Sequence, residues 1–165
     1  TDLIAGLPTD TPESFKNSLD SIVRLNVECI TVHTLCMKRA SRLTTEGVTL
    51  DLQQARDARE MLAYTQNILG QNEYIPYYMY RQSRMVGNLE NVGWSKRGFE
   101  SLYNVYVMDE THTILACGSG GVTKLKRNNP DYLERIFNFK YPYEYIDRFD
   151  ELIQRKSGIM QFYGQ

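Results

Sequence analysis

Three short stretches of this 165-residue sequence combine polar and conformationally special residues in ways that could serve chemistry. In the first, Asp2 opens an apolar run that ends in the turn Gly6, Leu7 and Pro8. An aspartate on an apolar strand costs desolvation free energy unless its carboxylate meets a partner. Ligands of α/β sheets and barrels lie at strand ends, so this carboxylate could accept hydrogen bonds from ribose hydroxyls or an amine. A plain exposed aspartate at a strand start is the alternative.

The second stretch is the glycine-rich loop 118–121, and the third is the segment 90–95, which holds the only tryptophan, Trp94. Glycines allow a backbone to approach a ligand closely or to adopt positive φ, although a tight turn explains the loop equally well. The loop does not have the spacing of a dinucleotide-binding fingerprint. Loops on rigid scaffolds often carry function, while an aromatic plug at one end of the core is the alternative for segment 90–95.

The histidines and tyrosines give weaker signals. His33 lies within a strand-like run and His112 in an expected turn, so neither pattern indicates a catalyst. Tyr77, Tyr78 and Tyr80 could stack on a flat ligand, but core packing explains alternating strand positions as well. No Ser-His-Asp or Cys-His arrangement can be defended.

The three cysteines, Cys29, Cys36 and Cys117, are far apart and odd in number. This argues against a disulfide framework, and no pair has the C-x-x-C spacing. We therefore expect three reduced thiols, typical of a cytoplasmic protein, and no metal or cluster site built from this chain alone.

The first 80 residues predict alternating strands and helices. Residues 2–8 predict a buried strand, and Thr11 followed by Pro12 predicts a helix start whose helix stops near Asn26. Residues 29–35 predict a second strand, 37–48 a loop, 51–69 a helix capped by Gly70, and 74–80 a third strand. Because Pro76 cannot donate to a ladder, that third strand should lie at an edge. Strand, helix, strand, helix, strand is the signature of parallel βαβ units.

Beyond residue 80 the pattern changes. Residues 83–100 predict a long polar loop, and 103–108 with 113–117 predict a hairpin. The tail from about Asn129 predicts two amphipathic helices, one around 132–137 and one around 145–153.

Composition excludes several classes of protein. The net charge of −1 and the lack of a large basic cluster argue against nucleic acid as a partner. No apolar run approaches the about 20 residues of a membrane span. The chain begins at Thr1 rather than Met, so we expect it to be excised from a longer protein.

Several blocks, in order, resemble one family, the radical-SAM, oxygen-independent coproporphyrinogen III oxidases. DLIAGLP (2–8) with TPESF (11–15) resembles the family's fifth strand and the helix after it. GFESLYN (98–104) and LACGSGGVT (115–123) are similar to its glycine–glutamate–serine segment and its glycine-rich loop. YYMYRQ (77–82) and VGNLENVG (86–93) resemble more specifically the branch named coproporphyrinogen dehydrogenase. The resemblance covers residues 1 to about 127.

This resemblance implies a fold, a reaction and cofactors. The fold would be α/β, the C-terminal half of a partial (βα)₆ radical-SAM barrel over 1–127, with a helical appendage over 128–165. The parent enzyme would cleave S-adenosylmethionine at a [4Fe–4S] cluster and decarboxylate two propionates of coproporphyrinogen III, giving protoporphyrinogen IX for haem. The family's cluster-binding C-x-x-x-C-x-x-C motif is not in this chain, so the fragment by itself is expected to be inactive and without the cluster.

The resemblance also implies three cofactor-binding positions. Asp2 matches a strand aspartate that contacts S-adenosylmethionine, Cys36 falls on a strand-end contact position where the best-known member has alanine, and Val122 falls where the glycine-rich loop makes an apolar contact. The sequence departs from the family at Ala5, where tyrosine is common, and at Thr123, where serine is usual. Some members handle haem instead, so the tetrapyrrole substrate does not follow.

Two further expectations concern partners. Half a barrel exposes strand edges, so the fragment should need the preceding half of its own chain, form a homodimer or be marginally stable. The rival interpretation, suggested by the missing cysteine motif and the twelve tyrosines, is a haem- or porphyrin-binding carrier without radical chemistry.

Overall fold

The computed structural model describes residues 1–38, 41–49, 51–83, 85–127 and 132–164, which form two compact units, Thr1–Leu102 and Tyr103–Gln165. The division lies earlier than the boundary at 127/128 that we expected from the extent of the family resemblance. That boundary stays a prediction about family segments. The expected tail start near Asn129 lies outside the described residues.

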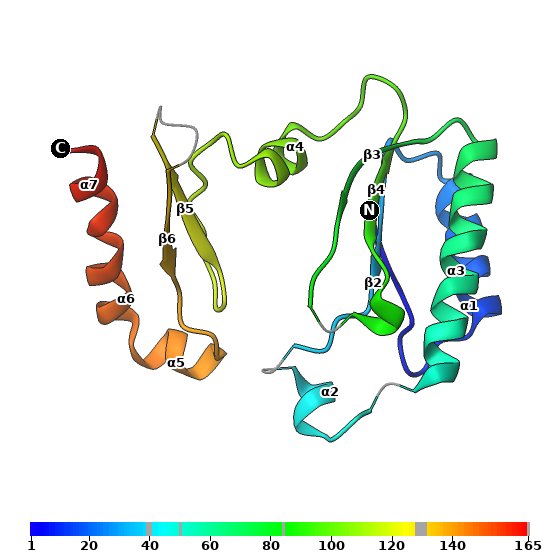
Figure 1. Cartoon of the computed structure of the whole chain (residues 1–165), viewed down its shortest axis with the longest axis horizontal. Coiled ribbons are helices and arrows are strands. Elements are labelled where there is room, and N and C mark those ends of the chain that lie inside the picture. The colour runs from blue at the N-terminus through cyan, green and yellow to red at the C-terminus, as the bar shows by residue number, and fades with distance from the viewer. Residues whose placement is uncertain (39–40, 50, 84, 128–131, 165) are drawn as a thin grey trace. The chain divides into compact units, whose positions relative to one another are not determined.

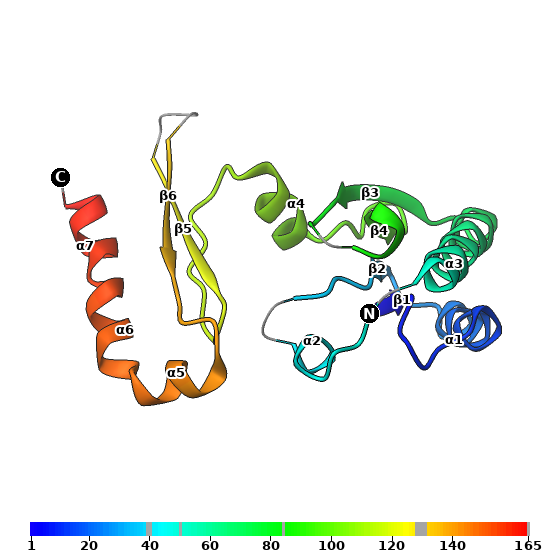
Figure 2. The same cartoon turned by 60° about the horizontal axis from the view of Figure 1, so that its bottom comes forward.

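The first unit is a four-stranded sheet with helices on one face (Figures 1 and 2). The sheet order is β1-β2-β4-β3, with β1 parallel to β2 and β4 antiparallel to both β2 and β3. The elements of this unit, in chain order, are β1 (Asp2–Ala5), α1 (Pro12–Arg24), β2 (Cys29–Thr34), α2 (Arg42–Thr45), α3 (Leu52–Gln71), β3 (Ile75–Tyr80), η1 (Val86–Asn88) and β4 (Asn91–Ser95).

The helix α1 begins and ends where its sequence predicts. The Thr11 hydroxyl accepts a hydrogen bond from the backbone N–H of Ser14, the Ser14 hydroxyl accepts one from the backbone N–H of Thr11, and Pro12 occupies the first turn. Asn26, just beyond the helix, has φ of 59°, the left-handed conformation that ends helices. The expected helix start at Thr11 and stop near Asn26 are confirmed.

The helix α3 also forms as expected, with one correction. Asp51 caps it and shares a capping box with Gln54. Gly70 was expected to cap the C-terminus, but the helix continues through Gln71 and ends at Asn72. The expectation was wrong because a single glycine costs a helix only about 1 kcal/mol, which the packing of the buried Leu69 beside it outweighs.

The core of the first unit lies between the sheet and the two long helices. Phe15 and Leu19 from α1, with Met61 and Leu69 from α3, are buried against the strands. The strand residues on this face include Ile30, Val32 and Trp94. Trp94 therefore belongs to the core, as the aromatic-plug alternative had it.

Gly6 ends β1 in a conformation that only glycine adopts easily. Its φ is 84°, and a Cβ atom there would lie 3.2 Å from Cβ of Ala58 on α3. We expect Gly6→Ala to lower the free energy of unfolding of the first unit by about 1–2 kcal/mol, because a left-handed non-glycine residue costs about that much. Urea unfolding followed by Trp94 fluorescence measures this. Gly47→Ala, also at positive φ but in open space, separates backbone strain from the contact with Ala58.

The strand β4 lies where we expected a loop. Residues 83–100 read as polar, but Asn91–Ser95 pairs with β2 and β3 and so separates them. Its asparagine and glycine have low strand propensity, and burial in the middle of the sheet outweighs that propensity. The expected succession of neighbouring parallel strands is therefore wrong for β3, although its expected edge position is confirmed.

The second unit holds a short helix, a hairpin and a helical end (Figure 1). Its elements are α4 (Leu102–Asp109), which starts at the last residue of the first unit, β5 (Val122–Lys126), β6 (Leu133–Phe137), α5 (Pro142–Asp147), α6 (Phe149–Lys156) and α7 (Gly158–Tyr163). The hairpin β5–β6 pairs Val122 with Phe137 and Lys126 with Leu133. The expected single helix around 145–153 is helical in the structure but is divided at Arg148 into α5 and α6.

Two expectations for this region are wrong. Residues 103–108 form helix α4 rather than a strand, and Ile114 bridges to Lys124 instead of pairing with them. The apolar residues around 132–137 form the strand β6 rather than a helix. Short apolar runs fit either period, and the edges of β5 pair with β6 and with Ile114 rather than with residues 103–108.

Glu110 forms ion pairs with one basic side chain from each strand of the hairpin. Its carboxylate lies 2.6 Å from Lys124 Nζ and 3.1 Å from an Arg135 nitrogen. The hydrogen bond from Lys124 is the main cause that lowers the pKa of Glu110, and the charge of Arg135 adds to it. The pKa of Glu110 is lower in the folded than in the unfolded chain, where it is near 4.5. The stabilisation from these ion pairs is therefore fully present above pH 4.5 and is lost as the pH falls through the folded pKa.

We therefore expect the second unit of Glu110→Gln to lose less stability than wild type when the pH falls below about 4.5. The difference should stay below about 1 kcal/mol because the pair is partly exposed. Calorimetry at several pH values measures the stability of the second unit. The transition that belongs to this unit is the one that leaves Trp94 fluorescence unchanged. Glu134→Gln is the control, and equal pH slopes for wild type and Glu110→Gln would contradict the prediction.

The α/β class expected from the sequence is confirmed. Three of the four strands of the first unit run in one direction, and β4 runs in the other. The partial (βα)₆ barrel stays a prediction, and the expected helical appendage contains the strand β6. In the described part of the chain, no helix is long and apolar enough to cross a membrane.

Candidate functional site

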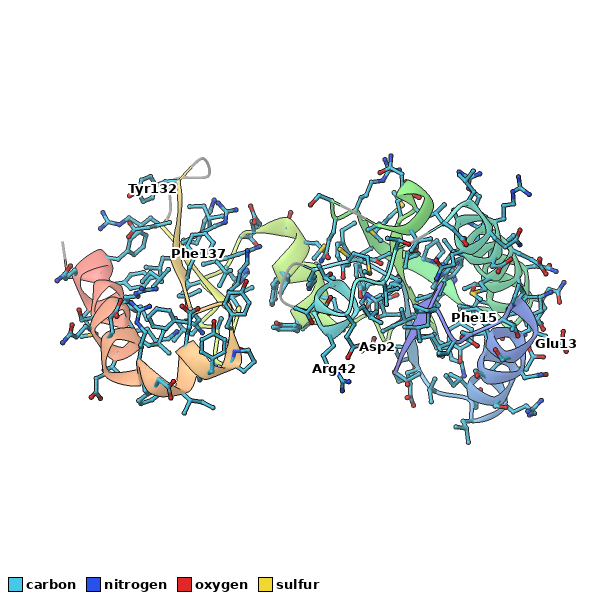
Figure 3. All side chains as sticks on the ribbon, turned by 90° about the horizontal axis from the view of Figure 1, so that it is seen from below. Asp2, Glu13, Phe15, Arg42, Tyr132 and Phe137 are labelled. Carbon is cyan, nitrogen blue, oxygen red and sulfur yellow. The ribbon has the colours of Figure 1, made fainter. Side chains whose placement is uncertain are left out.

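The face of the first sheet opposite α1 and α3 carries polar and aromatic side chains, and we call it the polar face. Strand alternation produces it, because Ile30 and Val32 point to the core and Thr31 and His33 therefore point away from it. Figure 3 shows Asp2 on the side of β1 away from Phe15. The register adds the partners of these residues on the other strands. The polar face comprises Asp2, Thr31, His33, Tyr78, Tyr80, Asn91 and Gly93, together with the exposed Ile4, which is in register with His33.

The ring of Tyr78 lies directly over Gly93 in the middle of this face. A Cβ atom on Gly93 would lie 1.9 Å from Cε1 of Tyr78, so only glycine leaves room for the ring. The Tyr78 hydroxyl lies 3.0 Å from Oγ1 of Thr31. The rings of Tyr78 and Tyr80 stack, with centroids 6.3 Å apart and an interplanar angle of 11°. These contacts hold two phenols side by side on the sheet.

Tyr80, His33 and Asp2 follow one another across the polar face. The Tyr80 hydroxyl lies 3.3 Å from Nδ1 of His33, and Nε2 of His33 lies 3.7 Å from Oδ1 of Asp2. Burial is the main cause that raises the pKa of Tyr80, while a hydrogen bond with Asn91 acts in the opposite direction. Tyr80 is therefore a protonated phenol at neutral pH, beside an imidazole and a carboxylate.

Of the residues implied by the resemblance, Asp2 and Cys36 lie near the same tyrosine. The Asp2 side chain is 68% exposed and is therefore open to a ligand. The Cys36 thiol donates to the carbonyl of Ser83 at 3.2 Å, just beyond the end of β2. The charges of Asp2 and Cys36 both act to raise the pKa of Tyr80, which places both residues around its phenol.

Val122, the third such residue, lies in the second unit at the start of β5. The glycine-rich loop before it turns through Gly118 and Gly120, whose φ angles are 84° and 72°. The Gly118 N–H donates to the Tyr145 hydroxyl at 3.2 Å, and Nδ2 of Asn138 donates to the Gly118 carbonyl at 2.8 Å. The loop is thus fixed by side chains from the following segments, which is consistent with the tight-turn alternative.

Sequence reasoning gave His33 and Tyr80 little weight and placed Asn91 in a loop. The strand period of two contained the signal for His33, because buried residues on both sides of it assign it to the opposite face. Nothing in the sequence pairs His33 on β2 with Tyr80 on β3, because the strand β4 that lies between β2 and β3 was not expected. Glu90, at the start of segment 90–95, forms an ion pair with Arg81.

The cysteines do not converge on a common site. Cys29 donates to the carbonyl of Phe99 at 2.8 Å, Cys36 bonds to Ser83, and Cys117 belongs to the second unit. Within the described ranges, no group of three or more histidine, cysteine or acidic side chains is placed to hold a metal ion. The described cysteines thus do not form a ligand set for an iron–sulfur cluster.

A surface hollow of about 830 Å³ lies elsewhere in the first unit, between the start of α3 and the turn η1. Asp51, Arg56 and Gly87 are among its lining residues. None of the lining residues belongs to the polar face, and the hollow contains no cluster of groups with complementary chemistry. The polar face is therefore the stronger candidate site.

Comparison with solved structures identifies the fold class. The chain is similar to coproporphyrinogen III oxidase HemN from Escherichia coli, described as a radical SAM enzyme, with a TM-score of 0.53 and 18% sequence identity. The similarity covers 91% of this chain and 33% of HemN. At this identity the likeness shows the fold alone.

Comparison with curated proteins is more specific. The chain is 36% identical over 160 residues to the oxygen-independent coproporphyrinogen-III oxidase-like protein HemZ of Bacillus subtilis (strain 168). The match covers 97% of this chain and 32% of HemZ, so the chain spans about a third of the relative's length. No family model matches. The resemblance noted in the sequence is confirmed, because nearly the whole chain is similar to a third of an oxygen-independent coproporphyrinogen-III oxidase-like protein.

Proposed function

We propose that this chain is a segment of a radical SAM oxidoreductase that decarboxylates two propionates of coproporphyrinogen III to give protoporphyrinogen IX in haem biosynthesis. The observation that carries the proposal is the 36% identity to HemZ over 97% of the chain. The segment by itself is inactive in this proposal, because the described cysteines do not form a ligand set for a cluster.

The cofactors of the proposed parent enzyme are S-adenosylmethionine and a [4Fe–4S] cluster. Together they supply a 5′-deoxyadenosyl radical that abstracts hydrogen from a propionate side chain. The residues on the polar face suit the first of these cofactors, since Asp2 is exposed and Thr31 and His33 surround it. Asp2 accepts hydrogen bonds from the ligand in this proposal, and Cys36 makes a small contact beside it. Val122, in the second unit, is proposed separately as an apolar cofactor-contact position.

The proposal extends to partners and location. The substrate is a tetrapyrrole, nucleic acid is not a partner, and the enzyme works in the cytoplasm. The strands β1 and β3 are the edges of the sheet, and the edge of β1 is available to pair with the preceding part of the barrel. In the isolated chain the same edge supports formation of a homodimer.

A carrier of haem or porphyrin without radical chemistry is the second candidate. Exposed aromatic side chains of the second unit favour it, since flat tetrapyrroles stack on such rings. These side chains include Tyr132, Phe137, Tyr141, Tyr143, Phe149 and Tyr163.

The experiment uses the full-length protein that contains this chain, purified without oxygen and with its cluster reconstituted. Cleavage of S-adenosylmethionine to 5′-deoxyadenosine, coupled to formation of protoporphyrinogen IX from coproporphyrinogen III, is the expected result. Cleavage without decarboxylation would keep the radical enzyme and reassign its substrate. Tight haem binding without any cleavage would favour the carrier.

A further inference from the structure

A chain of hydrogen-bonding groups crosses the polar face and ends at Asp2. It starts at Asn91, whose side chain is buried and whose Oδ1 accepts the backbone N–H of Thr34 at 2.7 Å. A backbone N–H can only donate, so it fixes the orientation of the amide, and Nδ2 of Asn91 is left as the donor. Nδ2 of Asn91 lies 4.0 Å from Sδ of Met85, and Asn91 acts to lower the pKa of Tyr80, as a donor beside the phenol oxygen does.

The second group in this chain is the hydroxyl of Tyr80. The Tyr80 hydroxyl lies 3.3 Å from Nδ1 of His33, and its O–H can donate to that nitrogen. Burial keeps the phenol protonated by raising its pKa. When His33 is neutral and Nδ1 accepts a hydrogen bond, the ring proton must be on Nε2.

The last group in this chain is the carboxylate of Asp2, beside the imidazole of His33. Nε2 of His33 lies 3.7 Å from Oδ1 of Asp2, which is an ion-pair distance and slightly longer than a hydrogen bond. The His33 side chain is 31% exposed, whereas Asp2 is 68% exposed. The N–H of His33 thus faces the carboxylate from within the sheet, and the solvent side of Asp2 stays open. Hydrogen bonds in ligand sites often shorten when the ligand binds.

We propose that His33, Tyr80 and Asn91 are positioning residues that orient Asp2 toward a ligand with hydroxyl or ammonium donors. The inference rests on the proposed function, in which Asp2 contacts S-adenosylmethionine, and it adds the residues that hold that carboxylate. Fixing a carboxylate before binding reduces the side-chain entropy that binding must remove. Thr31 and Tyr78 bond to each other and so do not compete for Asp2.

The first test observes the hydrogen bonds of His33 directly in the 165-residue chain. The chain has only two histidines, His33 and His112, so long-range ¹H–¹⁵N correlation spectra resolve both imidazoles. At a pH where His33 is neutral, we expect its proton on Nε2 and a clear change of the Nδ1 ¹⁵N shift in Tyr80→Phe. Tyr103→Phe, a change at an exposed tyrosine, is the matched control. An unchanged Nδ1 shift in Tyr80→Phe, or a proton on Nδ1, overturns the proposal.

The second test measures the affinity of the full-length protein for S-adenosylmethionine by calorimetric titration. We expect His33→Phe and Tyr80→Phe each to weaken binding about two- to tenfold, the effect of one hydrogen bond, and His33→Gln to restore part of the loss because its amide can donate to Asp2. Trp94 fluorescence of the 165-residue chain with the same substitution verifies that each variant is folded. If a His33 variant fails to fold, the imidazole spectra of wild type and Tyr80→Phe still decide.

The role of Asp2 and the roles of His33 and Tyr80 are tested separately. If Asp2→Asn does not weaken binding, the assignment of Asp2 to S-adenosylmethionine in the proposed function is wrong. If Asp2→Asn weakens binding but His33→Phe and Tyr80→Phe do not, or if His33→Gln binds no better than His33→Phe, the positioning role alone is wrong.

Discussion

Phe15→Ala should lower the free energy of unfolding of the first unit by about 3–5 kcal/mol, the usual cost of removing a buried phenylalanine. Phe15 is 1% exposed and lies where α1 packs on the sheet, together with Leu19, Met61 and Val32. Alanine leaves a cavity at this position, and the surrounding helices and sheet cannot move enough to fill it. Because typical domains are stable by only 5–15 kcal/mol, much of the native population should be lost.

Urea unfolding followed by fluorescence tests this, since the single tryptophan, Trp94, lies in the same core cluster and reports on the first unit alone. Leu25→Ala is the matched control at the end of the same helix, where the side chain is 75% exposed. It should change stability by no more than about 0.5 kcal/mol. A loss below about 1 kcal/mol in Phe15→Ala would show that this core is not packed as described.

Gly93→Ala should destabilise the same unit by about 1–3 kcal/mol, the usual cost of overpacking. The added methyl would lie 1.9–2.6 Å from three atoms of the Tyr78 ring, so the ring must move. Its hydrogen bond with Thr31 and its stacking on Tyr80 are then disturbed as well. The substitution therefore changes the polar face as well as the stability.

Gly70→Ala is the matched control for this change. It lies in α3 with no atom within 4 Å of the added methyl, and alanine there should stabilise the helix by about 0.5–1 kcal/mol. The variant Gly93→Ala/Tyr78→Ala locates the cause, because removal of the ring should relieve the clash and give a measurable coupling free energy. Additive effects of the two substitutions would refute the explanation.

The two predictions address opposite faces of one sheet. Phe15 lies on the face that α1 and α3 cover, and Gly93 lies on the polar face. The proposed ligand site therefore depends on a scaffold whose stability comes from the other side of the strands. A variant such as His33→Phe should alter ligand binding without the large loss expected for Phe15→Ala, since His33 is outside the core cluster.

The sequence by itself determined the features that depend on neighbouring residues. Thr11, Pro12 and Asn26 bound helix α1 because capping hydrogen bonds and backbone preferences act within a few residues. Asp51 starts α3 for the same reason. The blocks around Asp2 and the glycine-rich loop were enough to indicate the resemblance to coproporphyrinogen III oxidases, which the identity to HemZ confirms.

Only the tertiary structure decided the features that depend on distant partners. Asn91–Ser95 is a strand because two other strands pair with it, and Leu133–Phe137 is a strand because β5 offers an edge. The juxtaposition of His33 with Tyr80, 47 residues apart, follows from the insertion of β4 between their strands. Pairing and burial outweigh local propensity, and they bring together the residues to which the sequence alone gave little weight.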